Sequence, residues 1–197
     1  MGAHAGLTVE RITRAAAELA DRVGIDKVTA SALARGFGVK DASLYSHVKS
    51  LQEIRTRVAL LATEEINDRI ASAVAGRSGA DALTAFADAQ RTYAQQHPGR
   101  YAATQLRLDP ADFADTEALA RSVELTYAVM RHYRLDEPDL TDAVRLLRST
   151  FHGFIAIEAN GGFHHPRGVD GSWQRIVSGL HRLLESWPRT AQPARRA

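Results

Sequence analysis

The sequence predicts an all-α fold of about nine helices, in which three N-terminal helices are joined by a long helix to a helical body. Two observations lead to this prediction. Apolar residues recur every three or four positions along most of the chain, as at Val9, Ile12 and Ala16. No segment alternates apolar and polar side chains with the period of two that a half-buried strand requires. With 197 residues, of which 45% are hydrophobic, the chain can bury a substantial core.

Composition excludes several classes of protein. No apolar run approaches the roughly 20 residues of a membrane-spanning helix. The opening MGAHAG lacks the apolar core of a secretory signal, so we expect a cytoplasmic protein with no membrane partner. The absence of cysteine excludes disulfides, thiolate metal sites and cysteine nucleophiles. Residues 1–57 carry nine basic and six acidic side chains, whereas the whole chain has a net charge of only +2. This small N-terminal excess suits a DNA-binding head on a neutral body.

The first three helices are predicted from their caps. Thr8 can cap the start of the first helix, and Gly24 can end it. A second, short helix follows Thr29 and ends at Gly38, which permits the left-handed backbone of a tight turn. A third runs over 41–47. Because helices this short need neighbours to be stable, we expect all three to share one core. The predicted core residues are Leu19, Val23, Ile25, Val28, Leu33, Phe37, Val39, Leu44 and Val48.

The two short helices have the spacing of a helix-turn-helix. The outward-facing Lys40, Tyr45 and His47, followed directly by Lys49, suit base edges and phosphates in a major groove. The alternative is an ordinary helical hairpin with a solvated face, but such a hairpin needs no aromatic residue on its outer side. We expect Thr29, Ser31 and Lys49 to position the head on the DNA backbone. The full predicted DNA-binding set is Thr29, Ser31, Lys40, Ser43, Tyr45, His47 and Lys49.

The remaining elements follow from caps and breaks in the apolar pattern. Ser50 and Glu53 form a capping box that opens a long helix to about Val74. This helix can carry a movement between head and body, or it can be a plain connection. Gly76 to Gly79 interrupt the pattern. We expect later helices at about 80–96, 98–107, 116–133, 138–159 and 172–187, a loop at 160–168, and a tail with the composition of disorder at 189–197.

The segment from Ala32 to Ile54, ALARGFGVKDASLYSHVKSLQEI, resembles the DNA-binding domain of the TetR (tetracycline repressor-like) family of bacterial transcription regulators. The resemblance covers the first quarter of the chain. Many members have a lysine where this chain has Leu51, so either Lys49 takes over that phosphate contact or the contact is absent. The residues that carry the resemblance are Leu33, Ala34, Gly38, Val39, Leu44, Tyr45, His47 and Lys49.

Two helices of the body are predicted to form a dimer interface. Gly153 within a helix usually marks the close approach of another backbone or a ligand. The segment from Phe151 to Phe154 is similar to the motif of a TetR subgroup named for Trp-His-Gly, with Phe151 in place of the tryptophan. The alternative is a monomeric core with an incidental glycine. The predicted interface residues are Phe151, Gly153, Ile155, Trp173, Ile176, Leu180, Leu183 and Leu184.

Polar groups within the apolar faces of the body suggest a ligand cavity. Tyrosine and histidine each add one polar group to an apolar wall. Equally, tyrosines at helical spacing commonly belong to a core, with the hydroxyl at the surface. The predicted ligand-binding residues are Tyr93, Tyr101, Gln105, Tyr127, Met130, His152 and Phe154.

No motif in the sequence indicates catalysis, a metal site or a cofactor. His164 and His165 are adjacent in a loop, and there is no helical His-x-x-x-His pair, nucleophile elbow, phosphate loop or dinucleotide fingerprint. We therefore expect no enzyme activity, no metal and no cofactor. A non-DNA-binding helical protein that binds or transforms a small molecule is the main alternative. A non-specific DNA-packaging protein fits the modest net charge of +2 poorly.

The resemblance implies a homodimeric, ligand-responsive repressor. Its partners would be a pseudo-palindromic operator in double-stranded DNA, a second copy of the chain and a small-molecule effector. The predicted domains are a helix-turn-helix head at 1–52, a ligand-binding and dimerisation body at 53–188 and a tail at 189–197.

Overall fold

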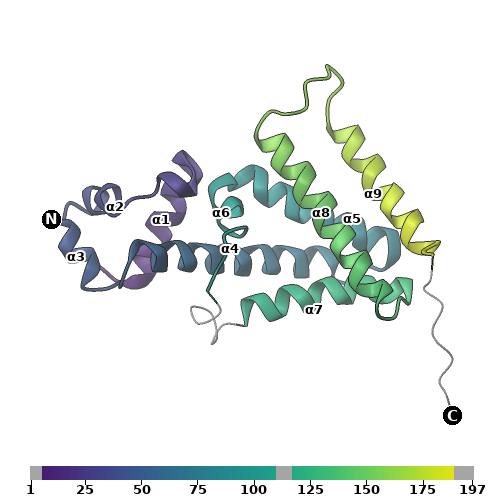
Figure 1. The fold of residues 1–197 in the computed structure, drawn as a ribbon, viewed down its shortest axis with the longest axis horizontal. Helices are drawn as coiled ribbons and strands as arrows, with labels where there is room; N and C mark the ends of the chain where they lie inside the picture. The colour runs from purple at the N-terminus through teal and green to yellow at the C-terminus, as the bar shows by residue number, and fades with distance from the viewer. Residues whose placement is uncertain (1–5, 110–116, 189–197) are drawn as a thin grey trace, which may run out of the picture. The chain divides into compact units, whose positions relative to one another are not determined.

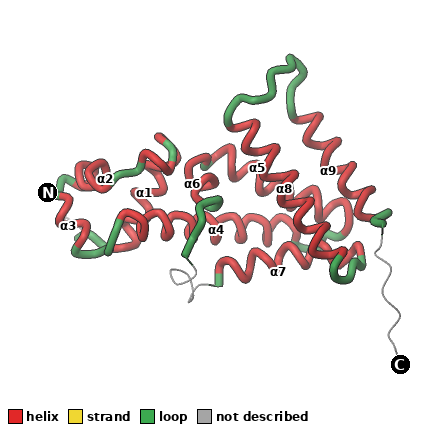
Figure 2. Tube along the Cα trace, in the orientation of Figure 1, coloured by secondary structure: helices red, strands yellow, loops and turns green. Residues whose placement is uncertain are grey.

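The computed structural model describes residues 6–109 and 117–188. Within these ranges the regular structure consists of nine α-helices and two short 3₁₀ segments, with no strand. Figure 2 colours these helices red and contains no yellow strand. The all-α prediction is therefore confirmed. The predicted tail at 189–197 and the predicted helix start at 116 lie outside the described residues. None of the described helices combines the length and apolar composition that crossing a bilayer demands.

The chain packs into two compact units. The first contains residues 1–67 and 93–120, and the second contains residues 68–92 and 121–197. The helices α4 (Leu51–Val74), α5 (Gly79–Gln96) and α7 (Ala118–Met130), labelled in Figure 1, each contribute to both units. The head at 1–52 stays a prediction about function, since these units are defined by packing alone.

The first unit contains the predicted head. Its other helical elements are α1 (Val9–Val23), η1 (Ile25–Lys27), α2 (Ala30–Phe37), α3 (Asp41–Tyr45) and α6 (Pro98–Ala103). The expected third helix is two residues shorter than predicted, because it ends at Tyr45 and a turn continues through His47. The helix expected at 98–107 also ends early, at Ala103: the hydroxyl of Thr104 donates to the carbonyl of Tyr101 at 2.7 Å and competes with continuation of the helix.

The predicted caps are present. The hydroxyl oxygen of Thr8 accepts from the Arg11 N–H, and that of Thr29 accepts from the Ala32 N–H, each at 3.2 Å. Gly38 has φ +68°, so it supplies the left-handed backbone of the turn between α2 and α3. These contacts satisfy donors and acceptors that the helix ends would otherwise leave unpaired.

The core of the first unit differs from the prediction in one respect. Ile25, Val28, Leu33, Leu44 and Val48 are buried, and Leu19, Phe37 and Val39 pack partly buried against them. Val23, however, is 41% exposed, so its predicted place in the core is wrong. It lies on the last turn of α1, whereas the buried face of that helix runs over Ile12, Ala16, Ala17 and Ala20.

The second unit also contains η3 (Arg131–Tyr133), α8 (Asp139–Ala159) and α9 (Asp170–Glu185). Its core is aromatic: the ring of Phe151 lies 6.4 Å from that of Phe86 and 5.5 Å from that of Trp173. The indole N–H of Trp173 donates to Asp88 at 2.7 Å. The predicted loop at 160–168 is confirmed, although α9 begins at Asp170, two residues earlier than expected.

A buried arginine joins three helices of the second unit. Arg91 on α5 donates to Glu158 on α8 and to Asp170 on α9, with its Nε 2.8 Å from Glu158 Oε2. The same guanidinium lies over the rings of Phe154 and Trp173. Hydrogen bonds to Glu158 raise the pKa of Arg91 above its ordinary value, against the opposing effect of burial. Arg91 is thus charged, paired and stacked at once.

Candidate nucleic-acid interface

The helix-turn-helix is held by one apolar anchor and one turn. Leu44 is fully buried and fixes α3 against the rest of the head. At the turn, the Val39 N–H donates to the carbonyl of Ala34 at 3.0 Å, and the Gly38 N–H donates to that of Arg35 at 3.1 Å. The orientation of α3 therefore depends on packing and turn geometry, and its outer face is left open.

Most of the predicted DNA-binding residues are exposed to solvent. Ser43 is half-buried, and the other six residues of the predicted set are exposed. Tyr45 is 47% exposed, although aromatic side chains are usually buried. An exposed tyrosine between polar residues is more informative here than an exposed lysine, because its apolar ring gains nothing from contact with water.

Two predicted phosphate-contacting hydroxyls also hold the head together. The hydroxyl of Ser31 donates to Asp41 at 2.5 Å and ties the start of α2 to the start of α3. Thr29 accepts the capping hydrogen bond from Ala32, which leaves its own O–H available for an outside acceptor. Thr29 can thus cap α2 and donate to a phosphate simultaneously, whereas Ser31 has already committed its hydrogen to Asp41.

Lys49 is positioned by the capping box of α4. The Glu53 N–H donates to Ser50 Oγ at 3.0 Å, and Glu53 Oε2 accepts from the Lys49 N–H at 2.6 Å. The predicted capping box is confirmed, except that Glu53 accepts from the N–H of Lys49, one residue before Ser50. Leu51 is half-buried and packs against the head core, so this position contributes packing and no charge. Lys49 remains exposed beside it.

Partial burial raises the pKa of Glu53, but hydrogen bonds from the Lys49 N–H and Arg57 outweigh it, and the net pKa is below its ordinary value. Arg57 completes this arrangement with an ion pair to Glu53 at 2.8 Å. The charged form of Glu53 is therefore the one that the fold stabilises.

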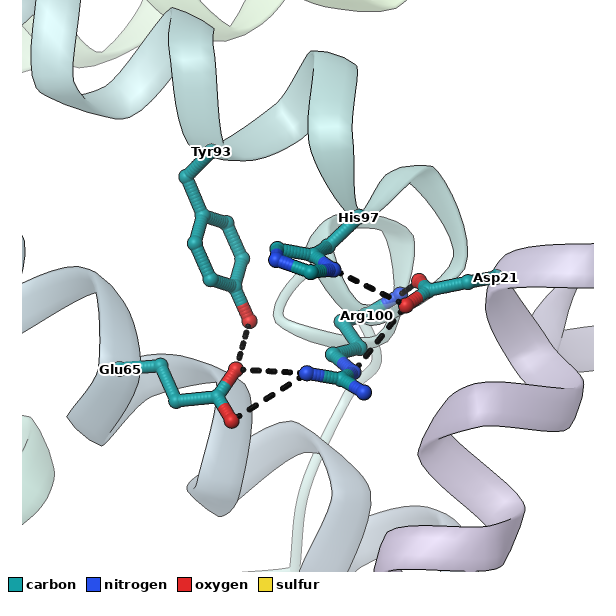
Figure 3. Close-up of polar contacts among 5 residues, drawn as sticks. All are labelled: Asp21, Glu65, Tyr93, His97 and Arg100. Carbon is teal, nitrogen blue, oxygen red and sulfur yellow. Dashed lines mark hydrogen bonds and ion pairs between the residues drawn. The ribbon is translucent and has the colours of Figure 1, made fainter.

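A polar network connects the helices of the first unit that carry Asp21, Glu65, Tyr93 and Arg100 (Figure 3). Arg100 on α6 lies between Asp21 on α1 and Glu65 on α4, with Nε 3.1 Å from Asp21 and Nη1 3.2 Å from Glu65. His97 Nδ1 lies 3.2 Å from Asp21, and the Tyr93 hydroxyl donates to Glu65 at 2.7 Å. Burial, together with the hydrogen bond to Glu65, raises the pKa of Tyr93 well above its ordinary value. All five residues belong to the first unit.

The same region contains a close backbone approach. A Cβ atom on Gly99 would lie 2.0 Å from the carbonyl oxygen of Ala20, so only glycine lets α6 meet α1 at this point. Sequence reasoning missed Asp21, Glu65, Gly99 and Arg100. The one usable signal was the Pro98-Gly99 pair, which marks a helix start but not its neighbour.

The predicted ligand-binding residues fall into both units. Tyr93 and Tyr101 are buried and Gln105 is exposed in the first unit, while Tyr127, Met130, His152 and Phe154 belong to the second. Tyr127 and Met130 line one open depression of about 490 Å³. Phe154 is buried under Arg91, and burial, assisted by Arg148, lowers the pKa of half-buried His152. The ligand-binding role of this set stays a prediction.

Five of the eight predicted interface residues lie in the core of their own chain: Phe151, Ile155, Trp173, Leu180 and Leu184 are all at most 7% exposed. The other three lie farther out. Leu183 is 41% exposed, Ile176 is half-buried, and a Cβ on Gly153 would have open space around it. Ile157, which was not predicted, is 46% exposed one turn after Gly153. A second copy would therefore meet this outer face, and the interface stays a prediction.

Comparisons with known proteins agree with this geometry. Residues 12–57 match the family model described as bacterial regulatory proteins of the tetR family, and residues 83–180 match a tetracyclin repressor-like C-terminal domain. An uncharacterized HTH-type transcriptional regulator of Mycobacterium tuberculosis is 37% identical over 158 residues, which cover 80% of this chain and 72% of that protein. YobS of Bacillus subtilis, another uncharacterized HTH-type regulator, is 31% identical over 86% of this chain and 88% of its own.

A solved structure of a TetR variant from Acinetobacter baumannii AYE, in complex with minocycline, has the same fold with a TM-score of 0.67. The two chains are 18% identical, and the match covers 93% of this chain and 99% of the Acinetobacter chain.

Proposed function

Because the chain belongs to the TetR family of DNA-binding transcription regulators, we propose that it is a ligand-responsive repressor that binds its operator as a homodimer. The observation that carries the proposal is the exposed surface from Lys40 to Lys49, with Tyr45 at its centre. In this proposal α3 enters a major groove, Lys40, Tyr45 and His47 contact bases or phosphates, and Thr29 and Lys49 contact the backbone.

Dimerisation would provide two heads, one for each half-site of the operator. Two heads on one face of a duplex read a pseudo-palindrome with half-sites about 34–36 Å apart, or a multiple of this spacing. We assign the dimer surface to the outer faces of α8 and α9, where Gly153 and Ile157 on one helix and Ile176 and Leu183 on the other are open or only half-covered. Apolar groups left uncovered on two neighbouring helices are typical of helix-to-helix interfaces.

Ligand response is the second part of the proposal. The similar TetR variant from Acinetobacter baumannii AYE has a structure with minocycline, which supports a small-molecule effector for this chain. To release DNA, an effector must bind the conformer with low operator affinity more tightly than the other, since equal affinity shifts nothing. The body would thus act by binding and not by catalysis, in the cytoplasm where the operator is. We also assign it to the Trp-His-Gly subgroup, with Phe151 in the tryptophan position.

The test is selection from a pool of random duplexes at about 150 mM salt, where non-specific binding is weak. We expect an enriched pseudo-palindrome. Tyr45→Ala should lower affinity for that sequence at least tenfold while circular dichroism stays unchanged. Phe163→Ala removes an aromatic side chain of similar exposure, 38% against 47%, in the loop between α8 and α9, and should leave operator affinity unchanged. No enrichment from the folded wild-type dimer, with or without candidate effectors, would contradict the proposal.

A further inference from the structure

We propose that the depression at the corner between α7 and α8 binds an organic anion with an apolar, ring-containing body. This inference rests on the proposed effector response, since it assigns that response a place and a ligand class. The depression lies within the second unit, has a volume of about 490 Å³ and is lined mainly by Tyr127, Met130, Arg131, Arg134, Leu135 and Leu140. Its volume falls within the range of about 300–1,000 Å³ that is common for small-molecule sites.

Its floor is apolar. Met130 is 1% exposed and Leu135 is 7% exposed, and Leu140 on α8 is half-buried beside them. Tyr127 forms part of the wall and is 41% exposed, which is unusual for an aromatic side chain at no known interface. A planar ring placed against Tyr127 and these side chains would remove apolar surface from water on both partners.

The rim is cationic. Arg131 is exposed and makes no ion pair with any residue in the described part of the chain. Arg134 follows three residues later, and Asp136 is the single carboxylate of the lining. Two guanidinium groups against one carboxylate favour a carboxylate or sulfonate on the ligand, because guanidinium binds such groups through paired N–H donors.

One of these cations belongs to a residue with unusual backbone geometry. Arg134 has φ +51° and is the non-glycine residue with left-handed backbone among the described residues. This conformation is strained for a residue with a Cβ atom, and glycine would avoid the strain. The chain thus has an arginine at a position whose backbone favours glycine, and the residue is exposed at the rim of the depression.

A second basic depression, on α9, provides the contrast. Its lining includes Arg167, Arg175 and Arg182 together with Gln174 and Ser178, and it has no large apolar side chain. This depression therefore has cations but no apolar surface against which a ring could pack. If charge alone captured organic anions, this surface would bind them as well as the α7–α8 corner does.

The experiment uses two fluorescent probes with the full-length protein. 8-Anilinonaphthalene-1-sulfonate carries the anion, and N-phenyl-1-naphthylamine has the same rings without it. We expect the sulfonate to bind at least tenfold more tightly than the neutral probe. The double variant Arg131→Gln/Arg134→Gly should weaken sulfonate binding at least tenfold and change neutral-probe binding less than twofold. Arg175→Gln/Arg182→Gln removes the same charge on α9 and should change neither. Tyr127→Ala should weaken both probes.

Equal affinity of the two probes, or equal loss of sulfonate binding in both double variants, would overturn the proposal. Circular dichroism and thermal unfolding of each variant separate loss of the site from loss of the fold. Operator selection is an independent measurement: an enriched operator with no probe binding at the corner would reject this inference and leave the repressor proposal standing.

Discussion

The carboxylate of Asp21, near the end of α1, contacts both the backbone N–H and the guanidinium of Arg100 on α6. One carboxylate oxygen accepts from the Arg100 N–H at 2.9 Å, and the other lies 3.1 Å from the guanidinium Nε. One acid thus accepts a hydrogen bond from a helix N-terminal amide and forms an ion pair with a cation. Because Asp21 and Arg100 are only 16% exposed at their side chains, water screens this pair weakly.

We expect Asp21→Asn to destabilise the protein by about 1–3 kcal/mol, since it leaves a half-buried cation with Glu65 as its main partner. The measurement is urea unfolding monitored by circular dichroism. Asp26→Asn, at an exposed acid close in sequence, serves as the control and should change the unfolding free energy by less than about 0.5 kcal/mol. Equal effects of the two variants would mean that the Asp21 contacts contribute nothing specific.

Gly99→Ala should be strongly destabilising, by about 3 kcal/mol or more, because the new Cβ would meet backbone atoms of Ala20 and neither helix can yield by rotating a side chain. The matched control is Gly36→Ala, where a Cβ has open space within α2 and no positive φ. That change should stabilise by about 0.5–1 kcal/mol through helix propensity. Thermal unfolding of both variants decides the matter: the two melting temperatures should move in opposite directions.

The capping box predicts a pH dependence. The pKa of Glu53 is lowered in the folded protein, so its contribution to stability is present above the pKa of the unfolded chain, about 4.3, and is lost as the pH falls through the lower folded value. Glu53→Gln should cost about 0.5–1 kcal/mol at pH 7. The difference between variant and wild type should shrink between about pH 4.5 and pH 3. A difference independent of pH across that interval would show that the carboxylate charge has no part in the cap.

Lys49→Gln should weaken binding nearly equally for operator and unrelated duplexes, because a phosphate contact carries no sequence information. The slope of log affinity against log salt concentration should become shallower by about 0.9, the value for one phosphate contact in double-stranded DNA. Lys27→Gln, at an exposed lysine of η1 outside the predicted set, is the control. An unchanged slope in Lys49→Gln would show that Lys49 does not contact a phosphate. Lys49 would then not replace the contact that Leu51 cannot make.

Gly153→Leu tests the dimer surface. A Cβ at this position meets no atom within 4 Å, so one folded chain should tolerate leucine and gain helix propensity. We expect the dimer dissociation constant, measured by sedimentation equilibrium, to rise at least tenfold while the fold is retained. Arg145→Leu adds an apolar side chain elsewhere on α8, at a residue with a 76% exposed side chain, and should not dissociate the dimer. An unaffected dimer in Gly153→Leu would move the interface away from this face.

Local signals predicted the head well. Thr8, Thr29, Gly38 and the Ser50 and Glu53 pair each act within four residues, so the sequence contains both partners of every contact. Long-range contacts were beyond such reasoning. Asp21 and Arg100 are 79 residues apart, and nothing in the local pattern indicates that they meet. Apolar residues of α8 and α9 were predicted at a dimer interface, but apolar periodicity cannot tell a face covered by the same chain from one covered by a second copy. Phe151 and Trp173 are therefore core residues of one chain, although they were predicted at an interface.

The contribution of α6 to the core around α1 has a consequence for building hybrid regulators. Ala103 is fully buried in that core, and Leu106 and Leu108 pack against it. A fusion that transplants only residues 1–52 onto a foreign body would bring along the surface of Ala20 without the glycine-containing helix that covers it. The transplantable cassette is therefore discontinuous, and a sensor built from this chain should exchange residues 93–109 together with the N-terminal segment.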